Sequence, residues 1–248
     1  MSVDCTFTCY FTGAVSCAFY PSYTAKSKSL NKTGWIRNSV VLLIELQYFS
    51  PSIFYSELRR CEYCLFEQYE HFQKAGFTNR CMVAGANGVI QLTVPVEGGR
   101  NQKVPLQEVR VSRAENWQAN HWKTLCSAYN RSPWFDHFRD ELEQLYSRSY
   151  HFLLDWNLAC FMWTCDKLSI SSKHTFTESY QKDYEENVKD WRGRLRPSTI
   201  NNNESSTTSY TQVFTERHGF IPNLSILDLL FCAGPAGLNL YNGFYSNR

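Results

Sequence analysis

The stretch Val40-Val41-Leu42-Leu43-Ile44, followed closely by Tyr48-Phe49-Ser50-Pro51, decides the fold that we expect. An unbroken run of β-branched and aliphatic residues is typical of a strand that is buried on both faces. Ser50 suits an N-cap and Pro51 the first helical position, so we expect a helix from there to about Arg60. A second strand is expected at about 63–69. The order strand, helix, strand favours a parallel pair, as in α/β sheets.

Further elements follow along the chain. They are a hairpin of strands at 80–84 and 89–96 around Asn87-Gly88, a strand at 104–111, helices at 115–129, 133–147 and 150–168, and a last helix at 224–232. Ser112-x-x-Glu115 and Ser132-Pro133 are helix-start signals. After Ser169 the periodicity weakens, and 201–209 are expected to form a low-complexity surface loop. We expect one α/β domain with a mixed or mostly parallel sheet and a helical middle section; an α+β arrangement is the alternative.

The composition excludes several classes of protein. The chain has 248 residues, of which 43% are hydrophobic. It therefore has enough apolar surface to fold around a core and is not largely disordered. Lys and Arg number 25 against 23 Asp and Glu, and a net charge of +2 disfavours a nucleic-acid binder. No stretch approaches the roughly 18 consecutive apolar residues that would span a bilayer.

Residues 1–39 are expected to be a poorly ordered extension outside the core, because they lack helical or strand periodicity. They also lack the positive leader of a signal peptide, so we expect a cytoplasmic protein with reduced cysteines. Cys61-x-x-Cys64 is the one pair with metal-ligand spacing, but no second pair matches it. We therefore expect no metal and no cofactor.

The densest polar cluster begins at the end of the second expected strand. Glu67, Glu70 and Lys74 are followed by Asn79-Arg80. Because ligands and anions gather at the carboxyl ends of parallel strands and at helix starts, we expect this cluster near the turn at 48–51. Lys and Arg suit phosphate or carboxylate, and the carboxylates could accept a proton or bind a sugar or amine. The alternative is a solvated loop whose charges pair with each other.

Two further polar residues lie in apolar helices. His121 shares a helical stripe with Trp117, and such a histidine is more often structural than a base. Asp228 lies in a helix that is apolar almost all round, so it must be paired or neutralised. We expect its partner in the arginine-rich segment 191–197, with Arg192 as a candidate. We expect the main role of both Asp228 and Arg192 to be structural, with a functional role second.

Several motifs occur together in order, and they resemble those of the WbqC-like protein family. They are Tyr48-Phe49-x-Pro51, Glu67-x-x-Glu70-x-x-x-Lys74-x-x-x-x-Asn79-Arg80, Asn87-Gly88, Trp117-x-x-x-His121-Trp122, Ala128-Tyr129-x-x-Ser132-Pro133, Tyr210-x-Gln212-x-Phe214, and Gly219-Phe220-x-Pro222-Asn223-Leu224-Ser225-Ile226-Leu227-Asp228. The resemblance is to the short form associated with Bacteroidetes-type bacteria. It covers about residue 41 to the end, so 40–248 are expected to form the WbqC-like domain.

The resemblance implies a protein of bacterial O-antigen gene clusters, for which transfer of glycine onto an amino sugar is the proposed role. We therefore expect a transferase of surface-polysaccharide biosynthesis that moves glycine or another acyl group to an amino sugar. The candidate residues are Glu67 or His121 as the base, Asn79 as a donor to the oxyanion or the substrate, Lys74 and Arg80 as the clamp for phosphate or carboxylate, and Tyr48 and Glu70 as substrate contacts.

The alternative function is a non-catalytic protein that binds a sugar or a nucleotide through aromatic stacking and the same cations. In both readings the partner is a small molecule, an amino sugar or nucleotide sugar, and not a nucleic acid. Cys81 is a candidate nucleophile, although a cysteine in a strand usually serves packing. Whether the chain forms a homo-oligomer is left open.

Overall fold

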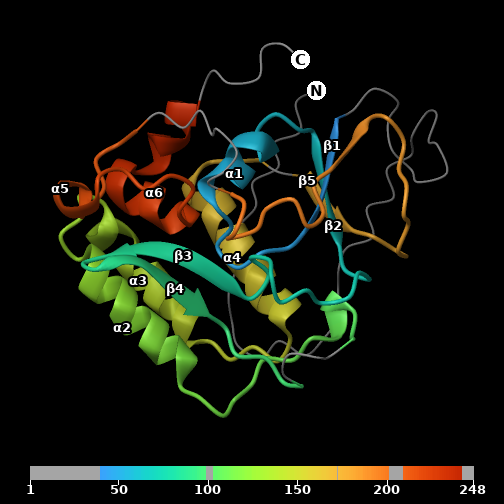
Figure 1. Ribbon diagram of the computed structural model, residues 1–248, viewed down its shortest axis with the longest axis horizontal. Coiled ribbons are helices and arrows are strands. Elements are labelled where there is room, and N and C mark those ends of the chain that lie inside the picture. Colours follow the sequence, from blue (N-terminus) through green and yellow to red (C-terminus); the bar gives the residue numbers. More distant parts are fainter. Residues whose placement is uncertain (1–39, 99–102, 172, 201–208, 242–248) are drawn as a thin grey trace, which may run out of the picture. The chain divides into compact units, whose positions relative to one another are not determined.

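A computed structural model describes residues 40–98, 103–171, 173–200 and 209–241 of the chain. All of them belong to one compact unit, Asn38–Arg248. The expectations for 1–39 and for nearly all of the loop at 201–209 lie outside the described residues. The described part is one α/β domain, as predicted (Figure 1).

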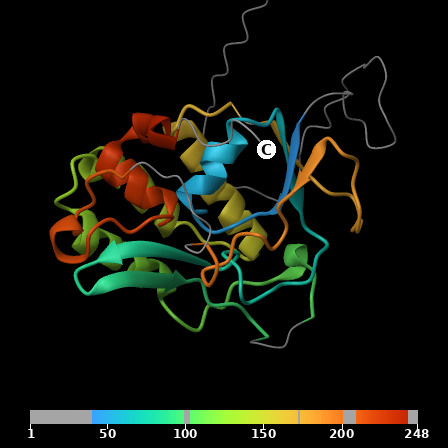
Figure 2. The ribbon, with the colours of Figure 1, turned by 45° about the horizontal axis from the view of Figure 1, so that its top comes forward.

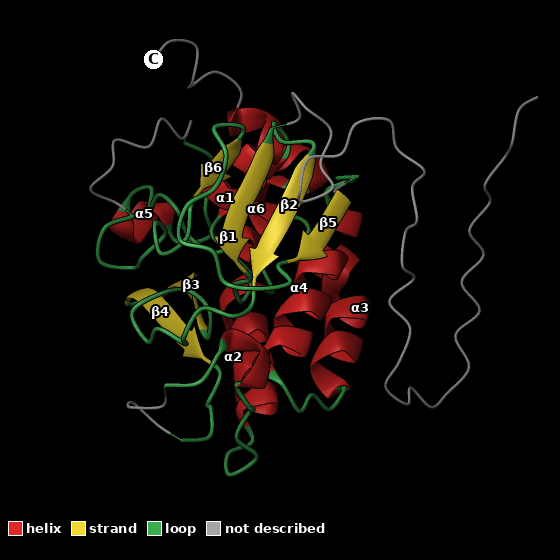
Figure 3. Ribbon diagram, turned by 90° about the vertical axis from the view of Figure 1, so that its right-hand side faces the viewer, coloured by secondary structure: helices red, strands yellow, loops and turns green. Residues whose placement is uncertain are grey.

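The larger sheet has four parallel strands in the order β5-β2-β1-β6. Their bounds are β1 Val41–Glu45, β2 Tyr63–Glu67, β5 Lys173–Phe176 and β6 Val188–Asp190. Helix α1 (Ser52–Leu58) connects β1 to β2, so the predicted strand-helix-strand unit is confirmed. Every residue of β1 is buried, which explains its unbroken apolar sequence. Figure 3 shows the four strands side by side with helices behind them.

The predicted hairpin is also confirmed. Strands β3 (Arg80–Gly85) and β4 (Gly88–Thr93) pair antiparallel around a tight turn, in which Gly88 has a φ of 112°. Only glycine adopts such a backbone without strain, which is why Asn-Gly signals the turn. The hairpin lies beside the C-terminal helices, drawn in red in Figure 2.

The helices follow in the middle and C-terminal parts of the chain, and all of them except α5 contribute side chains to the core. They are α2 (Trp117–Tyr129), α3 (Phe135–Ser147), α4 (Leu153–Lys167), α5 (Thr215–His218) and α6 (Ile226–Ala233). The three middle helices and α6 match the predicted ones to within a few residues. None of the helices in the described ranges is long and apolar enough to cross a membrane.

The predicted strand at 104–111 is wrong. This segment instead holds the 3-10 helix η2, Leu106–Glu108, flanked by isolated bridges at 105, 110 and 111. The N–H groups of Leu106 and Gln107 donate to the carbonyls of Glu70 and Gln68, so the segment follows the irregular loop after β2 rather than a strand. Conversely, β5 and β6 were not predicted, because strands of four and three residues that are half exposed carry no apolar run.

The predicted helix starts are shifted. Residue Pro51 is the N-cap of α1, and the carbonyl of Ser50 accepts the N–H of Ile226 instead. Helix α2 begins at Trp117, after Asn116, so 112–115 do not form a capping box. Helix α3 begins two residues later than predicted. At the starts of α1 and α3, the N–H groups of Ser52 and Trp134 donate to the carbonyls of Leu224 and Phe231, which are distant in sequence.

Candidate functional site

The four parallel strands end at an edge where the chain order reverses. From β1 the chain proceeds through β2 to β5 on one side, and β6 then lies on the other side of β1. In open α/β sheets, ligands bind outside the carboxyl ends of the strands at such a switch point. The candidate site is therefore the edge formed by the ends of β1, β2 and β6.

Glu45, the last residue of β1, is buried at this switch point. One carboxylate oxygen accepts the N–H of Gly193 at 3.0 Å, and the other accepts Nε2 of Gln47 at 2.9 Å. Burial disfavours the ionised form and raises the pKa of Glu45 to about 7, in spite of both hydrogen bonds. The group therefore gains or loses a proton near neutral pH, as general acid-base chemistry requires.

Gly193 connects Glu45 to Arg196. Its N–H donates to Glu45, and its carbonyl accepts Nε of Arg196 at 2.8 Å. Its φ of 61° is a left-handed conformation, and a Cβ here would lie 3.2 Å from Nη2 of Arg196. Both observations favour glycine at this position.

Glu67 ends β2 and is fully buried. One carboxylate oxygen accepts the N–H of Tyr69 at 2.8 Å and the hydroxyl of Thr177 at 3.0 Å. The other oxygen lies 3.6 Å from Nη1 of Arg192. These contacts hold the side chain of Glu67 in one position, so it connects β2 to Thr177 and Arg192.

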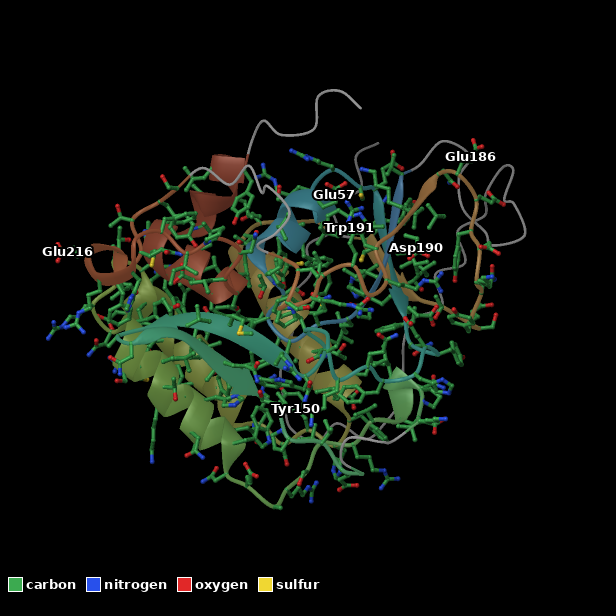
Figure 4. All side chains as sticks on the ribbon, in the orientation of Figure 1. Glu57, Tyr150, Glu186, Asp190, Trp191 and Glu216 are labelled. Atoms are coloured by element: carbon green, nitrogen blue, oxygen red, sulfur yellow. The ribbon has the colours of Figure 1, made fainter. Side chains whose placement is uncertain are left out.

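Arg192 follows β6, and the protein encloses its guanidinium group. Nε and Nη2 donate to the carboxylate of Asp190 at 2.6 to 3.1 Å, and the two Nη atoms donate to the carbonyls of Gln181 and Lys182. Asp190 pairs with Leu43 of β1, and the N–H of its neighbour Trp191 donates to the carbonyl of Leu43 at 2.8 Å (both are labelled in Figure 4). With two carboxylates and two carbonyls around it, Arg192 holds the loop before β6 against the sheet edge.

A small cleft lies next to Glu45. Glu70, Gln73, Gly193 and Arg196 are among the residues that line it, and its enclosed part has a volume of about 20 Å³. That is enough for about one water molecule. Nε2 of Gln73 donates to Glu70 at 3.0 Å, and burial raises the pKa of Glu70 while Arg192 lowers it. Two acids and one guanidinium therefore face the same space.

The side chain of Arg80 contacts the backbone of Lys74, and neither residue lines the cleft. Lys74 is exposed, and its carbonyl accepts Nη2 of Arg80 at 2.5 Å. Nη1 of Arg80 donates to the side chain of Gln91 at 3.2 Å. The structure thus separates this pair of cations from Glu45 and the cleft lining.

Asn79 has a structural partner within the hairpin. It is buried, and its side-chain amide donates to the carbonyl of Val94 at 3.0 Å. That bond anchors the end of β4 to the start of β3. Asn79 does not line the cleft either.

Tyr48 and His121 meet inside the aromatic core. The hydroxyl of Tyr48 lies 3.0 Å from Nδ1 of His121 and 2.5 Å from the hydroxyl of Tyr146. The ring of Trp117 packs edge-on against His121 at 5.2 Å. Burial lowers the pKa of His121 to about 4, so the imidazole is neutral at physiological pH. The structure brings Tyr48 and His121 together, away from the lining of the cleft.

The turn at 48–51 contacts the loop that carries the polar cluster, because the N–H of Tyr48 donates to the carbonyl of Phe77 at 3.1 Å. The turn is buried, and the segment before α6 covers it. The N–H of Ser52 donates to the carbonyl of Leu224 at 3.2 Å, and the hydroxyl of Ser225 donates to the carbonyl of Phe49 at 2.9 Å. The helix start is therefore occupied by the carbonyl of Leu224 and the hydroxyl of Ser225, from the C-terminal part of the chain.

The predicted pairing of Asp228 with the arginine-rich segment is also wrong. Asp228 is fully buried and accepts hydrogen bonds from the hydroxyls of Tyr129 and Tyr210, each at 2.7 Å, and from Nε2 of Gln212 at 2.8 Å. The donors are neutral, and burial raises the pKa of Asp228. Arg192 is instead bound to Asp190.

The cysteines of the described part offer no metal site. Cys64 is fully buried in β2, and burial raises the pKa of the partly buried Cys61 to about 11. Over the ranges that the structure describes, no three His, Cys, Asp or Glu side chains form a group that could hold a metal ion.

Sequence reasoning missed Glu45, Gly193 and Arg196. A signal for Glu45 was present, because an acidic residue directly follows the apolar run of β1 and so ends a buried strand. Gly193 and Arg196 belong to a segment without periodicity, and its position next to β1 depends on β6. Only the tertiary structure could place them.

Together, these features define an open-sheet α/β protein with a candidate site at the carboxyl ends of its parallel strands. The WbqC-like protein family model matches residues 47–200, and the chain belongs to this family. Searches of the curated proteins and of the solved structures found no match.

Proposed function

We propose that this chain is a transferase of bacterial surface-polysaccharide biosynthesis that moves glycine or another acyl group onto the amino group of a sugar. The observation that carries the proposal is Glu45, a buried carboxyl group that titrates near pH 7 at the switch point of the sheet. Family membership supports it. The site is the mouth of the cleft beside Glu45, because the cleft itself has room for only about one water molecule.

The reaction needs a base for the proton of the amine. The amine nitrogen attacks the carbonyl carbon of an activated acyl donor, the bond to the donor's leaving group breaks, and the nitrogen loses a proton. With a pKa of about 7, Glu45 is about half ionised at neutral pH, so it can accept that proton and release it again. We therefore assign Glu45 the role of the base in place of Glu67 and His121.

The other acids of the site recognise the acceptor in this proposal. Glu70 lines the cleft beside Glu45, and carboxylates bind amino and hydroxyl groups of sugars through charge-assisted hydrogen bonds. Glu67 positions the edge through Thr177 and Arg192. Lys74 is exposed and free to reach a phosphate outside the cleft.

A non-catalytic sugar-binding protein is the second candidate. The observation that favours it is Cys81, which is fully buried and has its pKa raised by burial, so it cannot serve as a thiolate nucleophile. A covalent acyl-enzyme on this cysteine is thereby disfavoured. If the chain is a transferase, the amine of the sugar must attack the carbonyl carbon of the acyl donor directly.

The test compares binding with turnover in the full chain. Amino sugars, free and nucleotide-linked, should raise the melting temperature, and a ligand at 100 times its dissociation constant adds about 2.7 kcal/mol. With a glycyl thioester as donor, Glu45→Gln should retain binding and lose transfer about 100-fold or more. The matched control is Glu216→Gln, on the exposed helix α5 (Figure 4), which should change neither.

Three outcomes separate the readings. Transfer at the wild-type rate in Glu45→Gln would contradict the role of Glu45 as base. Binding without transfer in the wild-type protein would favour the non-catalytic reading. A lack of any stabilisation by amino sugars would contradict both.

A further inference from the structure

One cation in the cleft has no acidic partner. Nε of Arg196 donates to the carbonyl of Gly193 at 2.8 Å, and Nη2 donates to the side-chain oxygen of Gln73 at 3.3 Å. Neither acceptor carries a charge. Within the described ranges, no carboxylate forms an ion pair with Arg196, although Glu45 and Glu70 line the same cleft.

The other cations near this edge are engaged elsewhere. Arg192 is neutralised by Asp190 and Glu67. Arg80 donates to Gln91 and to a backbone carbonyl outside the cleft lining. Arg196 lines the cleft, whereas Arg192 and Arg80 do not.

Its surroundings orient the guanidinium group without cancelling its charge. The hydrogen bonds that Arg196 donates to Gln73 and Gly193 fix one edge of the planar fork, while Nη1 has no hydrogen-bond partner among the described residues. The planar guanidinium group can donate two parallel hydrogen bonds to two oxygens of a carboxylate or a phosphate. Because the side chain of Arg196 is already held in place, it loses less conformational entropy when the anion binds. Glu45 repels such an anion only when it is ionised.

We infer that Arg196 binds an anionic oxygen group, a carboxylate or a phosphate, of the ligand that occupies this cleft. Gln73 and Gly193 are its positioning residues. The assignment of the anionic group to Arg196 is independent of the proposed function. The position of the amine, toward Glu45 and Glu70, rests on the proposed function. The site therefore takes a ligand that carries both charges.

The test is calorimetric titration of the full chain with inorganic phosphate and, separately, with acetate. The wild-type protein should bind at least one of them, and the tighter probe identifies the anionic group. Arg196→Gln should weaken that binding about tenfold or more, because a hydrogen bond to a charged group is lost. Arg196→Lys should retain part of it, since the charge remains and the fork is lost.

Two variants serve as controls. Arg194 is exposed on the same turn, and Arg80 represents the pair of cations outside the cleft. Arg194→Gln and Arg80→Gln should bind the probe like the wild type. Binding that is equal in wild type and Arg196→Gln, lost in Arg80→Gln, or absent for both probes would overturn the inference.

These results are independent of amino-sugar transfer. If transfer requires Glu45 but Arg196→Gln leaves anion binding unchanged, the inference fails and the proposed function stands. If anion binding depends on Arg196 and no amino sugar binds or reacts, the proposed function fails alone.

Discussion

Asp228→Ala is expected to destabilise the fold by about 3–5 kcal/mol, because it removes the acceptor from a buried polar network. Its carboxylate accepts from Tyr129, Tyr210 and Gln212. The hydroxyl of Tyr129 also accepts the N–H of Ala84 at 2.9 Å, so the network links α6 to β3, α2 and the segment before α5. The hydroxyls of Tyr129 and Tyr210 would lose their acceptor at once, whereas Gln212 would keep its bond to the carbonyl of Ile221.

Urea unfolding would measure this loss. Asp228→Asn keeps the shape and one acceptor oxygen, so its cost should be smaller. Asp136→Ala is the control, because Asp136 is exposed on α3 and its ion pair with Arg139 is a surface pair worth less than about 1 kcal/mol. A loss for Asp228→Ala no larger than that of the control would contradict the network.

Glu45→Gln and His121→Asn are expected to give the folding free energy opposite dependences on pH. Burial raises the pKa of Glu45 from 4.5 to about 7 and lowers that of His121 from 6.5 to about 4. The contribution of Glu45 to stability is complete below pH 4.5 and is lost as the pH rises to 7. The contribution of His121 is complete above pH 6.5 and is lost as the pH falls to 4.

In the wild-type protein the two effects should nearly cancel between pH 4.5 and 6.5. In that interval the folded state holds one proton on Glu45, and the unfolded state holds one on His121. Removing Glu45 should leave stability that rises by roughly 1 kcal/mol per pH unit, and removing His121 should leave stability that falls by a similar amount.

The measurement is the free energy of unfolding in urea at several pH values across this interval. His137→Asn is the matched control, because His137 is exposed on α3 and its loss should leave the wild-type profile unchanged. Profiles of equal slope for Glu45→Gln and His121→Asn would contradict the buried states of both groups.

Most of the fold could be predicted because the sequence signals of its helices, strands and turns are local. The apolar run of β1, the Asn-Gly turn of the hairpin and the periodic helices α2 to α4 each carry their signal within a few neighbouring residues. The family motifs are local in the same sense. The prediction of a strand at 104–111 failed because apolar and polar residues alternate imperfectly there and because the backbone hydrogen bonds of this segment go to the loop after β2.

The candidate site could be predicted only in part. Glu67 and Glu70 were found because they follow a strand, and a strand's carboxyl end is a known place for function. Tyr48 and His121 could not be excluded from the site by their spacing, since the same spacing serves a core position. Their burial and their mutual hydrogen bond place them inside.

By itself, then, the sequence determined the family, the parallel strand-helix-strand unit, the hairpin and the order of the main helices, because apolar periodicity and turn chemistry act over short distances along the chain. Only the tertiary structure decided that Glu45 titrates near pH 7, that Arg196 faces the cleft, and that Asp228 binds two tyrosines. These properties depend on desolvation and on contacts such as the one between Glu45 and Gly193, whose partners are distant in sequence.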